Sequence, residues 1–341
     1  MKPEEVNTEA ISFANGDHSG DEPPKFYDKR TFMSFMPESI NLVYSGFRAY
    51  IDKFRNYRSL KREFYRKVNY ELDLERPRSY NEKIQWKKLN DRNPLLTVTA
   101  DKFAVRQYLK EVLGEKAAQD ILIPLYYVTE HPETIPFDDL PEKFVVKPNH
   151  GSQMHIIVRD KNKISREKIV GECRKWLHVY YGYYTYEWAY RNIKRKIIVE
   201  KLIEKKNGEL PADYKFYCFH GKCRFIRVSS NRLGENSHTG YFDTDWKLIN
   251  AGVPGYGYNH PFKKPDNLEK MIKLAEELSG PFDFVRVDLY DLENKIQFGE
   301  LTHYEASGLA RLEPESFDFE LGSYWEIKPE YWISDQYIKR M

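Results

Sequence analysis

The chain has 341 residues, which is enough for one large domain or two modest ones. Hydrophobic residues make up 41% of the chain, charged residues make up 31%, and the net charge is +2, so the composition indicates a soluble globular protein without a strong general attraction to nucleic acid. No run of about 18 apolar residues occurs, so the sequence predicts no membrane-spanning helix.

The first hundred residues divide into a tail and a helical region. Residues 1–25 are polar and rich in Gly and Pro, which predicts a disordered tail. Residues 26–100 are predicted to form a mostly helical N-terminal region, because apolar side chains recur there at helical spacing. One helix is expected at residues 47–68 and a second from Tyr80, and a third is expected to start at Asp101.

The predicted helix at residues 47–68 is both amphipathic and basic. It carries eight Lys and Arg residues against Asp52 and Glu63. This pattern is typical of a surface helix with solvated charges, and equally of a helix that contacts an anionic membrane surface or an anionic polymer. The few cysteines and the lack of a signal peptide predict a cytoplasmic protein, and the second alternative would place it peripherally at the inner face of the membrane.

From about residue 120 the pattern changes to short runs rich in β-branched and aromatic residues, with helices between them. Neighbouring runs separated by short turns favour antiparallel hairpins, so the predicted fold class is α+β. An amphipathic helix is predicted at residues 266–279. Strands are predicted at Ile121–Ile123, Phe144–Lys147, Ile156–Val158, Ile197–Ile203, Tyr214–Phe219, Phe225–Ser229, Phe284–Tyr290 and Lys295–Thr302.

A turn rich in small and polar residues follows the predicted strand that ends at Lys147. It reads Pro-Asn-His-Gly-Ser over residues 148–152. Such a turn exposes backbone N–H groups to a phosphate, and the lysine adds a positive charge. A plain hairpin turn is the alternative.

Two further strands carry weaker signals for a nucleotide. The strand that ends in Glu200-Lys201-Leu202-Ile203 offers backbone groups to an adenine edge, or is simply a core strand. Asp213 and Lys215 share one face of the next predicted strand because side chains alternate. They suit a ribose hydroxyl and a phosphate, or form an ion pair across strands.

The strongest signal is the predicted hairpin of residues 284–302. With a turn near Glu293, Arg286 is expected opposite Glu300, and Asp288 opposite Phe298. Arg286, Asp288, Glu300 and Thr302 then share one face, because strand side chains alternate. Two close carboxylates repel each other and call for a cation, and oxygen ligands suit Mg²⁺. An exposed hairpin held by ion pairs is the alternative.

The order of these segments resembles the ATP-grasp superfamily, and more closely its branch named after teichuronopeptide biosynthesis (TupA-like). The resemblance covers about residues 75–327. It is carried by Ser79-Tyr80-Asn81-Glu82-Lys83-Ile84-Gln85-Trp86, Asp101-Lys102, Val146-Lys147-Pro148-Asn149-His150-Gly151-Ser152, Glu187-Trp188, Ile198-Val199-Glu200-Lys201, Asp213-Tyr214-Lys215-Phe216, Arg286-Val287-Asp288 and Glu300-Leu301-Thr302.

The resemblance implies an ATP-grasp fold, in which two α+β subdomains with antiparallel sheets grip ATP behind a mostly helical N-terminal region. The small subdomain with the phosphate-binding loop would span residues 101–203, and the C-terminal subdomain with the metal site residues 204–330. Residues 331–341 would form a C-terminal tail.

The resemblance also implies which residues bind ATP. Two lysines would hold its phosphates under a flexible loop, a hinge would read adenine, and an aspartate would bind ribose. These residues are Lys102 and Lys147, the loop Asn149, His150, Gly151 and Ser152, the hinge residues Glu200, Lys201 and Ile203, and Asp213, with Lys215 as a further phosphate contact.

The implied metal ligands are Asp288, Glu300 and Thr302, and the implied catalytic residues are Arg286 and Lys215. Arg286 would stabilise the acyl phosphate and the tetrahedral species. Thr302 stands where many ATP-grasp enzymes carry Asn, so the resemblance supports one Mg²⁺ and leaves a second open. His303 and Glu305 stand where the branch is expected to carry an aromatic residue and a proline.

The function implied by the resemblance is ATP-dependent carboxylate–amine ligation through an acyl phosphate, with ATP and Mg²⁺ as cofactors. The expected partners are a carboxylate-bearing saccharide, such as a uronic acid of a surface polysaccharide or capsule, and an amine. One alternative is an ATP-grasp kinase that phosphorylates a saccharide hydroxyl and needs the same site. The other is a non-catalytic glycan-binding protein that uses the basic helix of residues 47–68 and the aromatic residues.

Overall fold

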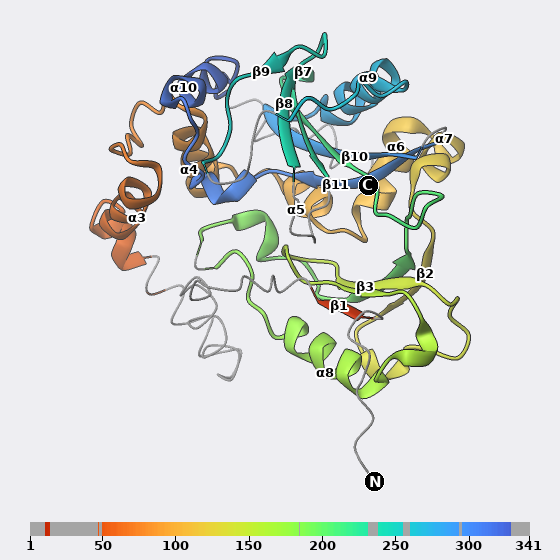
Figure 1. Cartoon of the computed structure of the whole chain (residues 1–341). Coiled ribbons are helices and arrows are strands. Elements are labelled where there is room, and N and C mark those ends of the chain that lie inside the picture. The colour runs from red at the N-terminus through yellow and green to blue at the C-terminus, as the bar shows by residue number, and fades with distance from the viewer. Residues whose placement is uncertain are drawn as a thin grey trace.

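The structure, a computed structural model, describes residues 11–13, 47, 50–183, 185–230, 238–254, 260–292 and 295–328. Two antiparallel sheets dominate it. Sheet A has the strand order β1-β4-β3-β5-β2, and sheet B has the order β11-β10-β6-β7-β8-β9. Figure 1 shows the two sheets one above the other. Helix α8 (Arg166–Leu177) lies below sheet A, and α9 (Leu268–Ser279) lies next to sheet B, away from sheet A.

All strands of sheet A precede those of sheet B along the chain. Sheet A consists of β1 (Ile11–Phe13), β2 (Leu125–Thr129), β3 (Phe144–Pro148), β4 (Ile156–Val158) and β5 (Ile197–Lys201). Sheet B consists of β6 (Asp213–Phe219), β7 (Lys222–Ser230), β8 (His238–Asp243), β9 (Leu248–Ile249), β10 (Phe284–Leu292) and β11 (Lys295–Thr302).

Other helices of the described residues lie between β1 and β2 or follow sheet B. They are α3 (Arg58–Val68), α4 (Tyr80–Asn90), α5 (Pro94–Ala100), α6 (Val105–Leu113), α7 (Glu115–Ile121) and α10 (Glu315–Ser323). Short 3₁₀ turns occur at η2 (Pro132–Thr134), η3 (Lys161–Lys163), η4 (Trp188–Tyr190) and η5 (Glu305–Gly308). Local sequence explains two of the starts: Ser79 and Glu82 form a capping box for α4, and Asn93 caps α5, which has Pro94 in its first turn.

Each sheet has its own hydrophobic core. The larger core joins the buried residues of β6, β7 and β10 to those of α9, including Met271 and Leu278. The smaller core packs Ile169 and Cys173 of α8 against Phe144 and Val199 of sheet A. All seven residues of β6 are buried. Its polar residues therefore lie inside the protein, where polar groups need partners.

Helix α4 anchors the turn η5 that follows sheet B. Gln85 donates hydrogen bonds to the carbonyls of Ser307 (2.9 Å) and Gly308 (2.7 Å), and Lys88 donates to the Ser307 carbonyl (2.8 Å). Ala306 and Ser307 have positive φ angles of 44° and 59°. Such angles are unfavourable for residues other than glycine and persist where surrounding contacts enforce them. The α4 contacts thus fix where this turn places its side chains.

The predicted α+β class, with two antiparallel sheets behind a mostly helical region, is confirmed. The predicted strand Ile121–Ile123 is wrong, because Ile121 ends α7 and the strand begins at Leu125. Strands β8 and β9 had no counterpart in the prediction. Within the predicted disordered tail of residues 1–25, Ile11–Phe13 pair with β4. The rest of that tail and residues 331–341 lie outside the described residues.

Candidate functional site

The hairpin of β10 and β11 supplies the centre of the site. Arg286 lies opposite Thr302, and Asp288 lies opposite Glu300; the register then shifts after Asp288, so that Leu289 pairs with Phe298. The predicted pairing of Arg286 with Glu300 and of Asp288 with Phe298 is therefore wrong. The four polar residues nevertheless share one face, as predicted, because the shift from the expected pairing is an even number of residues.

Asp288 is buried and accepts hydrogen bonds from two cations. Its Oδ1 accepts from Arg286 Nε at 2.6 Å, and its Oδ2 accepts from Arg286 Nη2 at 2.6 Å and from Lys215 Nζ at 2.5 Å. Burial alone would raise the pKa of Asp288, but the Arg286 and Lys215 charges outweigh it and lower this pKa to about 2. Asp288 is thus a carboxylate at neutral pH. Lys215 also bonds Asp213 at 2.5 Å.

Arg286 contacts three carboxylates. It donates two hydrogen bonds to Asp288 in a fork-like geometry, through Nε and Nη2. Its Nη2 also lies 3.2 Å from Glu300 Oε1, and its Nη1 forms an ion pair with Glu305. Burial would lower the pKa of Arg286, but the Asp288 carboxylate raises it above the ordinary value. A planar guanidinium presents five donors in a rigid fork and can bond one carboxylate through two parallel hydrogen bonds, whereas a lysine ammonium acts as a point charge. Arg286 is therefore a fixed positive charge at the centre of the site.

Sheet A contributes the second group of charges. Lys147 of β3 forms an ion pair with Glu200 of β5 at 2.5 Å, and Arg106 of α6 lies 3.8 Å from the other oxygen of Glu200. Val145 pairs with Glu200 in the sheet, so Glu200 shares a face with Lys147, two residues further on. The Glu200 carboxylate therefore holds Lys147 in place.

Lys102 connects the two groups. Its Nζ donates to the carbonyl of Gly151 at 2.5 Å and lies 3.7 Å from Glu300 Oε2. Its backbone N–H donates to the Asn149 carbonyl at 2.9 Å. Burial lowers the pKa of Lys102, Glu300 raises it and Lys147 lowers it further, and the balance is a pKa below the ordinary value. Lys102 thus contacts both the loop after β3 and the carboxylate on β11.

The loop of residues 149–152 is held by contacts with the segment of residues 181–196. Asn149 accepts from the N–H of Lys196 at 2.7 Å and donates to the Lys194 carbonyl at 3.0 Å. Ser152 and Tyr181 share a hydrogen bond between their hydroxyls at 2.8 Å. A side chain at Gly151 would approach Tyr181 to 2.8 Å, and its φ of 72° also favours glycine.

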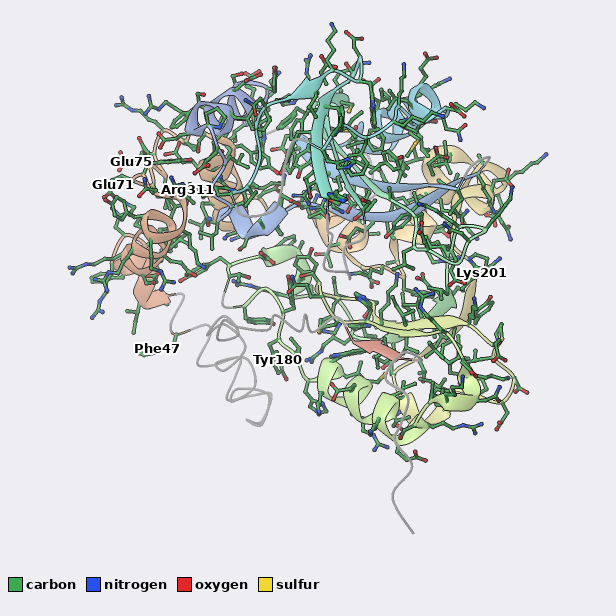
Figure 2. All side chains as sticks on the ribbon, in the orientation of Figure 1. Phe47, Glu71, Glu75, Tyr180, Lys201 and Arg311 are labelled. Atoms are coloured by element: carbon green, nitrogen blue, oxygen red, sulfur yellow. The ribbon has the colours of Figure 1, made fainter. Side chains whose placement is uncertain are left out.

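His150 and the hinge residues complete the predicted nucleotide set. His150 is buried, and burial together with the Lys102 and Arg195 charges lowers its pKa to about 3, so it is neutral. Lys201 ends β5 with an exposed side chain, seen near the connection between the sheets in Figure 2, and its N–H donates to the Pro124 carbonyl at 2.9 Å. Ile203 is half-buried in the segment that leads to sheet B.

The donor chemistry of β10 and β11 fits one magnesium ion. Asp288 and Glu300 lie directly opposite each other, and two carboxylates with phosphate oxygens and water form a common ligand set for Mg²⁺. The Thr302 hydroxyl donates to Glu300 Oε1 at 3.3 Å, so it supports this carboxylate. Across the described residues, no three His, Cys, Asp or Glu side chains gather as a metal cage, so the ion would depend on the nucleotide for further ligands.

Three charged residues near the site were not among the predicted site residues. Glu305 accepts from Arg227 at 2.9 Å and from the Tyr217 hydroxyl at 3.1 Å, in addition to its ion pair with Arg286. Arg106 supports Glu200. Arg227 of β7 lies opposite Lys215 of β6. The alternation of side chains along the strands of sheet B could therefore have predicted that Arg227 lies on the same face as Lys215. No spacing signal identifies Glu305, whose position depends on the turn η5.

Two antiparallel sheets, with Lys147 on one and the paired carboxylates Asp288 and Glu300 on the other, are the arrangement that the resemblance to the class of ATP-grasp proteins implies. The chain belongs to one family of that class: the model of the TupA-like ATP-grasp family matches residues 82–326. No curated protein matches the chain. Within the described residues, no helix is both long and apolar enough to cross a bilayer.

Solved structures of ligases are similar to this chain at low identity. The D-alanine–D-alanine ligase from Bacillus anthracis is 17% identical, with 61% of this chain and 59% of that chain covered and a TM-score of 0.36. The D-alanine–D-alanine ligase from Helicobacter pylori is 12% identical, with 72% and 69% covered and a TM-score of 0.40. The L-amino acid ligase from Bacillus licheniformis is 14% identical, with 62% and 44% covered and a TM-score of 0.37. The alignment thus spans less than two thirds of the first of these ligases.

We expect Lys147→Gln to weaken binding of Mg·ATP by about tenfold or more, because a charged hydrogen bond contributes about 1.5–3 kcal/mol. Titration calorimetry with ATP and Mg²⁺ measures this change. Lys143→Gln is the matched control, since Lys143 precedes the same strand and also pairs with a glutamate, Glu204, at 2.8 Å. Equal affinity of the Lys147 variant and the unaltered chain would rule out the phosphate role of Lys147.

Proposed function

We propose that this chain is an ATP-dependent carboxylate–amine ligase that forms an acyl phosphate and releases ADP. The observation that carries the proposal is the pairing of Asp288 and Glu300 across β10 and β11, with Arg286 on the same face and Lys102 reaching Glu300 from the turn between α5 and α6. This arrangement combines cations for phosphate oxygens with carboxylates for a metal.

The residues divide the work by their charge. Lys102, Lys147 and Lys215 offset negative charge on the β- and γ-phosphates, while Asp213 accepts a ribose hydroxyl. The loop 149–152 covers the phosphates, and backbone groups near Lys201 and Ile203 bond the adenine edge. Asp288 and Glu300 would hold a magnesium ion, which would supply positive charge that offsets the negative charge of the phosphates.

The chemistry has two steps. An oxygen of the acceptor carboxylate attacks the γ-phosphorus, the bond to the β-phosphate oxygen breaks, and ADP leaves. The amine then attacks the acyl carbon, and inorganic phosphate leaves as the amide forms. Arg286 faces oxygens that gain negative charge in both steps. Because a preorganised donor needs no rearrangement during the reaction, Arg286 is expected to stabilise the transition states.

The proposed acceptor is a uronic acid or similar carboxylate of a surface polysaccharide, and the amine is an amino acid or a simpler amine. This part of the proposal follows the resemblance of the chain to the TupA-like branch. It places the protein in polysaccharide or capsule biosynthesis on the cytoplasmic side of the membrane.

Hydroxylamine tests the reaction class without knowledge of the natural amine. The full chain is incubated with ATP, Mg²⁺ and saccharides that carry uronic acids. A ligase releases ADP and yields a hydroxamate from the acyl phosphate, which ferric iron reveals by colour. A kinase releases ADP and yields a stable phosphoester without hydroxamate, which would overturn the ligase proposal. Absence of any Mg²⁺-dependent ATP binding would favour a non-catalytic glycan-binding protein.

A further inference from the structure

The outer surface of the first helices presents aromatic rings that the proposed chemistry does not use. Phe47, Tyr50 and Phe54 are helical residues with 63%, 71% and 87% of their surface exposed. Their spacing of three and four residues puts them on one side of a helix. Figure 2 shows Phe47 at the outer edge of the molecule.

Positive charge accompanies these rings. The basic surface is defined here as the exposed cations between residues 50 and 67, namely Lys53, Arg55, Arg58, Arg62, Arg66 and Lys67. Within the part of the chain that the structure describes, none of the six forms an ion pair. Residues 50–67 contain seven Lys and Arg against Asp52 and Glu63, so this short segment carries more positive charge than the whole chain's net +2.

Inward contacts fix which side of these helices faces outward. Leu60, Phe64 and Val68 of α3 are buried in a small core with Tyr186. Asp52 accepts hydrogen bonds from the Tyr186 hydroxyl at 2.7 Å and from the Ser59 N–H at 3.2 Å. Asp52, which lies between Tyr50 and Phe54 in the sequence, therefore directs its carboxylate to partners inside the protein.

Acidic residues lie at the other end of this region. Figure 2 shows Glu71 and Glu75 beyond the far end of α3 from Phe47. Glu63 on α3 is half-buried. The rings and the basic surface thus occur together, whereas the nearby exposed carboxylates are set apart from Phe47.

We propose that Phe47, Tyr50, Phe54 and the basic surface bind the face of an anionic lipid bilayer. Lipid headgroups attract Lys and Arg within a Debye length of the surface, and aromatic rings enter the interfacial layer. A soluble polyanion would neutralise the cations but leave three exposed rings in water. The combination of rings and cations therefore favours the bilayer over a polymer.

Vesicle co-sedimentation of the full chain tests the proposal at about physiological salt. We expect binding to vesicles of phosphatidylglycerol and phosphatidylcholine and little binding to phosphatidylcholine alone. The triple variant Phe47→Ser/Tyr50→Ser/Phe54→Ser should bind at least tenfold more weakly, and so should Arg58→Glu/Arg62→Glu/Arg66→Glu. The control Lys264→Glu/Lys270→Glu/Lys273→Glu changes three exposed lysines in and near α9 and should bind as the unaltered chain does.

Three results would overturn the proposal. They are equal binding to neutral and anionic vesicles, unchanged binding of the aromatic variant, and an equal loss in the control. Binding to dextran sulfate without binding to vesicles would also overturn it and would favour an anionic polymer. Unchanged thermal melting of the variants shows that a loss of binding is not a loss of fold. The vesicle experiment requires neither ATP nor a substrate, so its outcome is independent of the proposed ligase activity.

Discussion

Asp288→Asn is expected to abolish magnesium-dependent binding of ATP and to lower kcat/KM by at least about 100-fold, because loss of even an outer partner of a metal ligand costs about 10–100-fold. Asparagine keeps the shape of the side chain but loses the charge that faces Arg286 and Lys215. Titration calorimetry with ATP, in the presence and absence of Mg²⁺, measures the binding. The hydroxamate assay measures turnover.

Loss of stability must be separated from loss of the metal ligand. Removing one partner of a buried ion pair costs up to about 3–5 kcal/mol, so the variant is also expected to melt at a lower temperature. Asp283→Asn is a matched control, because Asp283 is also buried and forms an ion pair of 2.5 Å with a buried lysine, Lys87. This pair is not part of the site. If Asp283→Asn loses Mg²⁺-dependent binding as well, below both melting transitions, Asp288 has no special role.

Arg286→Lys is expected to lower kcat by about 100-fold while changing the affinity for ATP little, because a lost transition-state donor costs about 10²–10³-fold. Lysine retains the positive charge but cannot keep the fork on Asp288 together with the contacts to Glu300 and Glu305. Steady-state ADP release at varied ATP, with an acceptor and an amine that support turnover, separates kcat from KM.

Arg159→Lys is the control for this substitution. Arg159 also bonds a glutamate, Glu204, at 2.6 Å, but it is partly exposed and lies outside the charged cluster. Exposed pairs contribute about 0–1 kcal/mol, so this variant should behave as the unaltered chain does. A rise in KM for ATP at unchanged kcat in Arg286→Lys would assign Arg286 to ground-state binding and contradict the role in the transition states.

Strand periodicity predicted which face each polar residue occupies, but not which residues lie opposite each other. Arg286, Asp288, Glu300 and Thr302 share a face under any pairing that shifts by an even number of residues. The actual pairing depends on the irregularity after Asp288, where Leu289 meets Phe298. Such a local feature leaves no mark in an alternating pattern of apolar and polar residues.

Long-range contacts explain the other gaps in the prediction. Glu305 reaches Arg286 because Gln85 and Lys88, more than 200 residues earlier, hold the turn at Ser307. The same helix α4 supplied one of the segments of the family resemblance without a stated role. Conversely, Ile121 ends α7 although the β-branched residues Ile121 and Ile123 favour a strand, because propensity is weaker than the surrounding packing.

The contact of Lys102 with both Gly151 and Glu300 has a consequence for how nucleotide and metal would enter. In the structure Lys102, Lys147 and Lys215 are each neutralised by a carboxylate of the protein. Phosphate groups that drew Lys102 and Lys215 away would leave Arg286 as the cation that still bonds Glu300 and Asp288, so a divalent ion would offset the excess negative charge of these carboxylates. ATP would thus bind the lysines of these ion pairs, and the metal ion would bind their carboxylates. By thermodynamic reciprocity, the factor by which magnesium raises the affinity for ATP equals the factor by which ATP raises the affinity for magnesium.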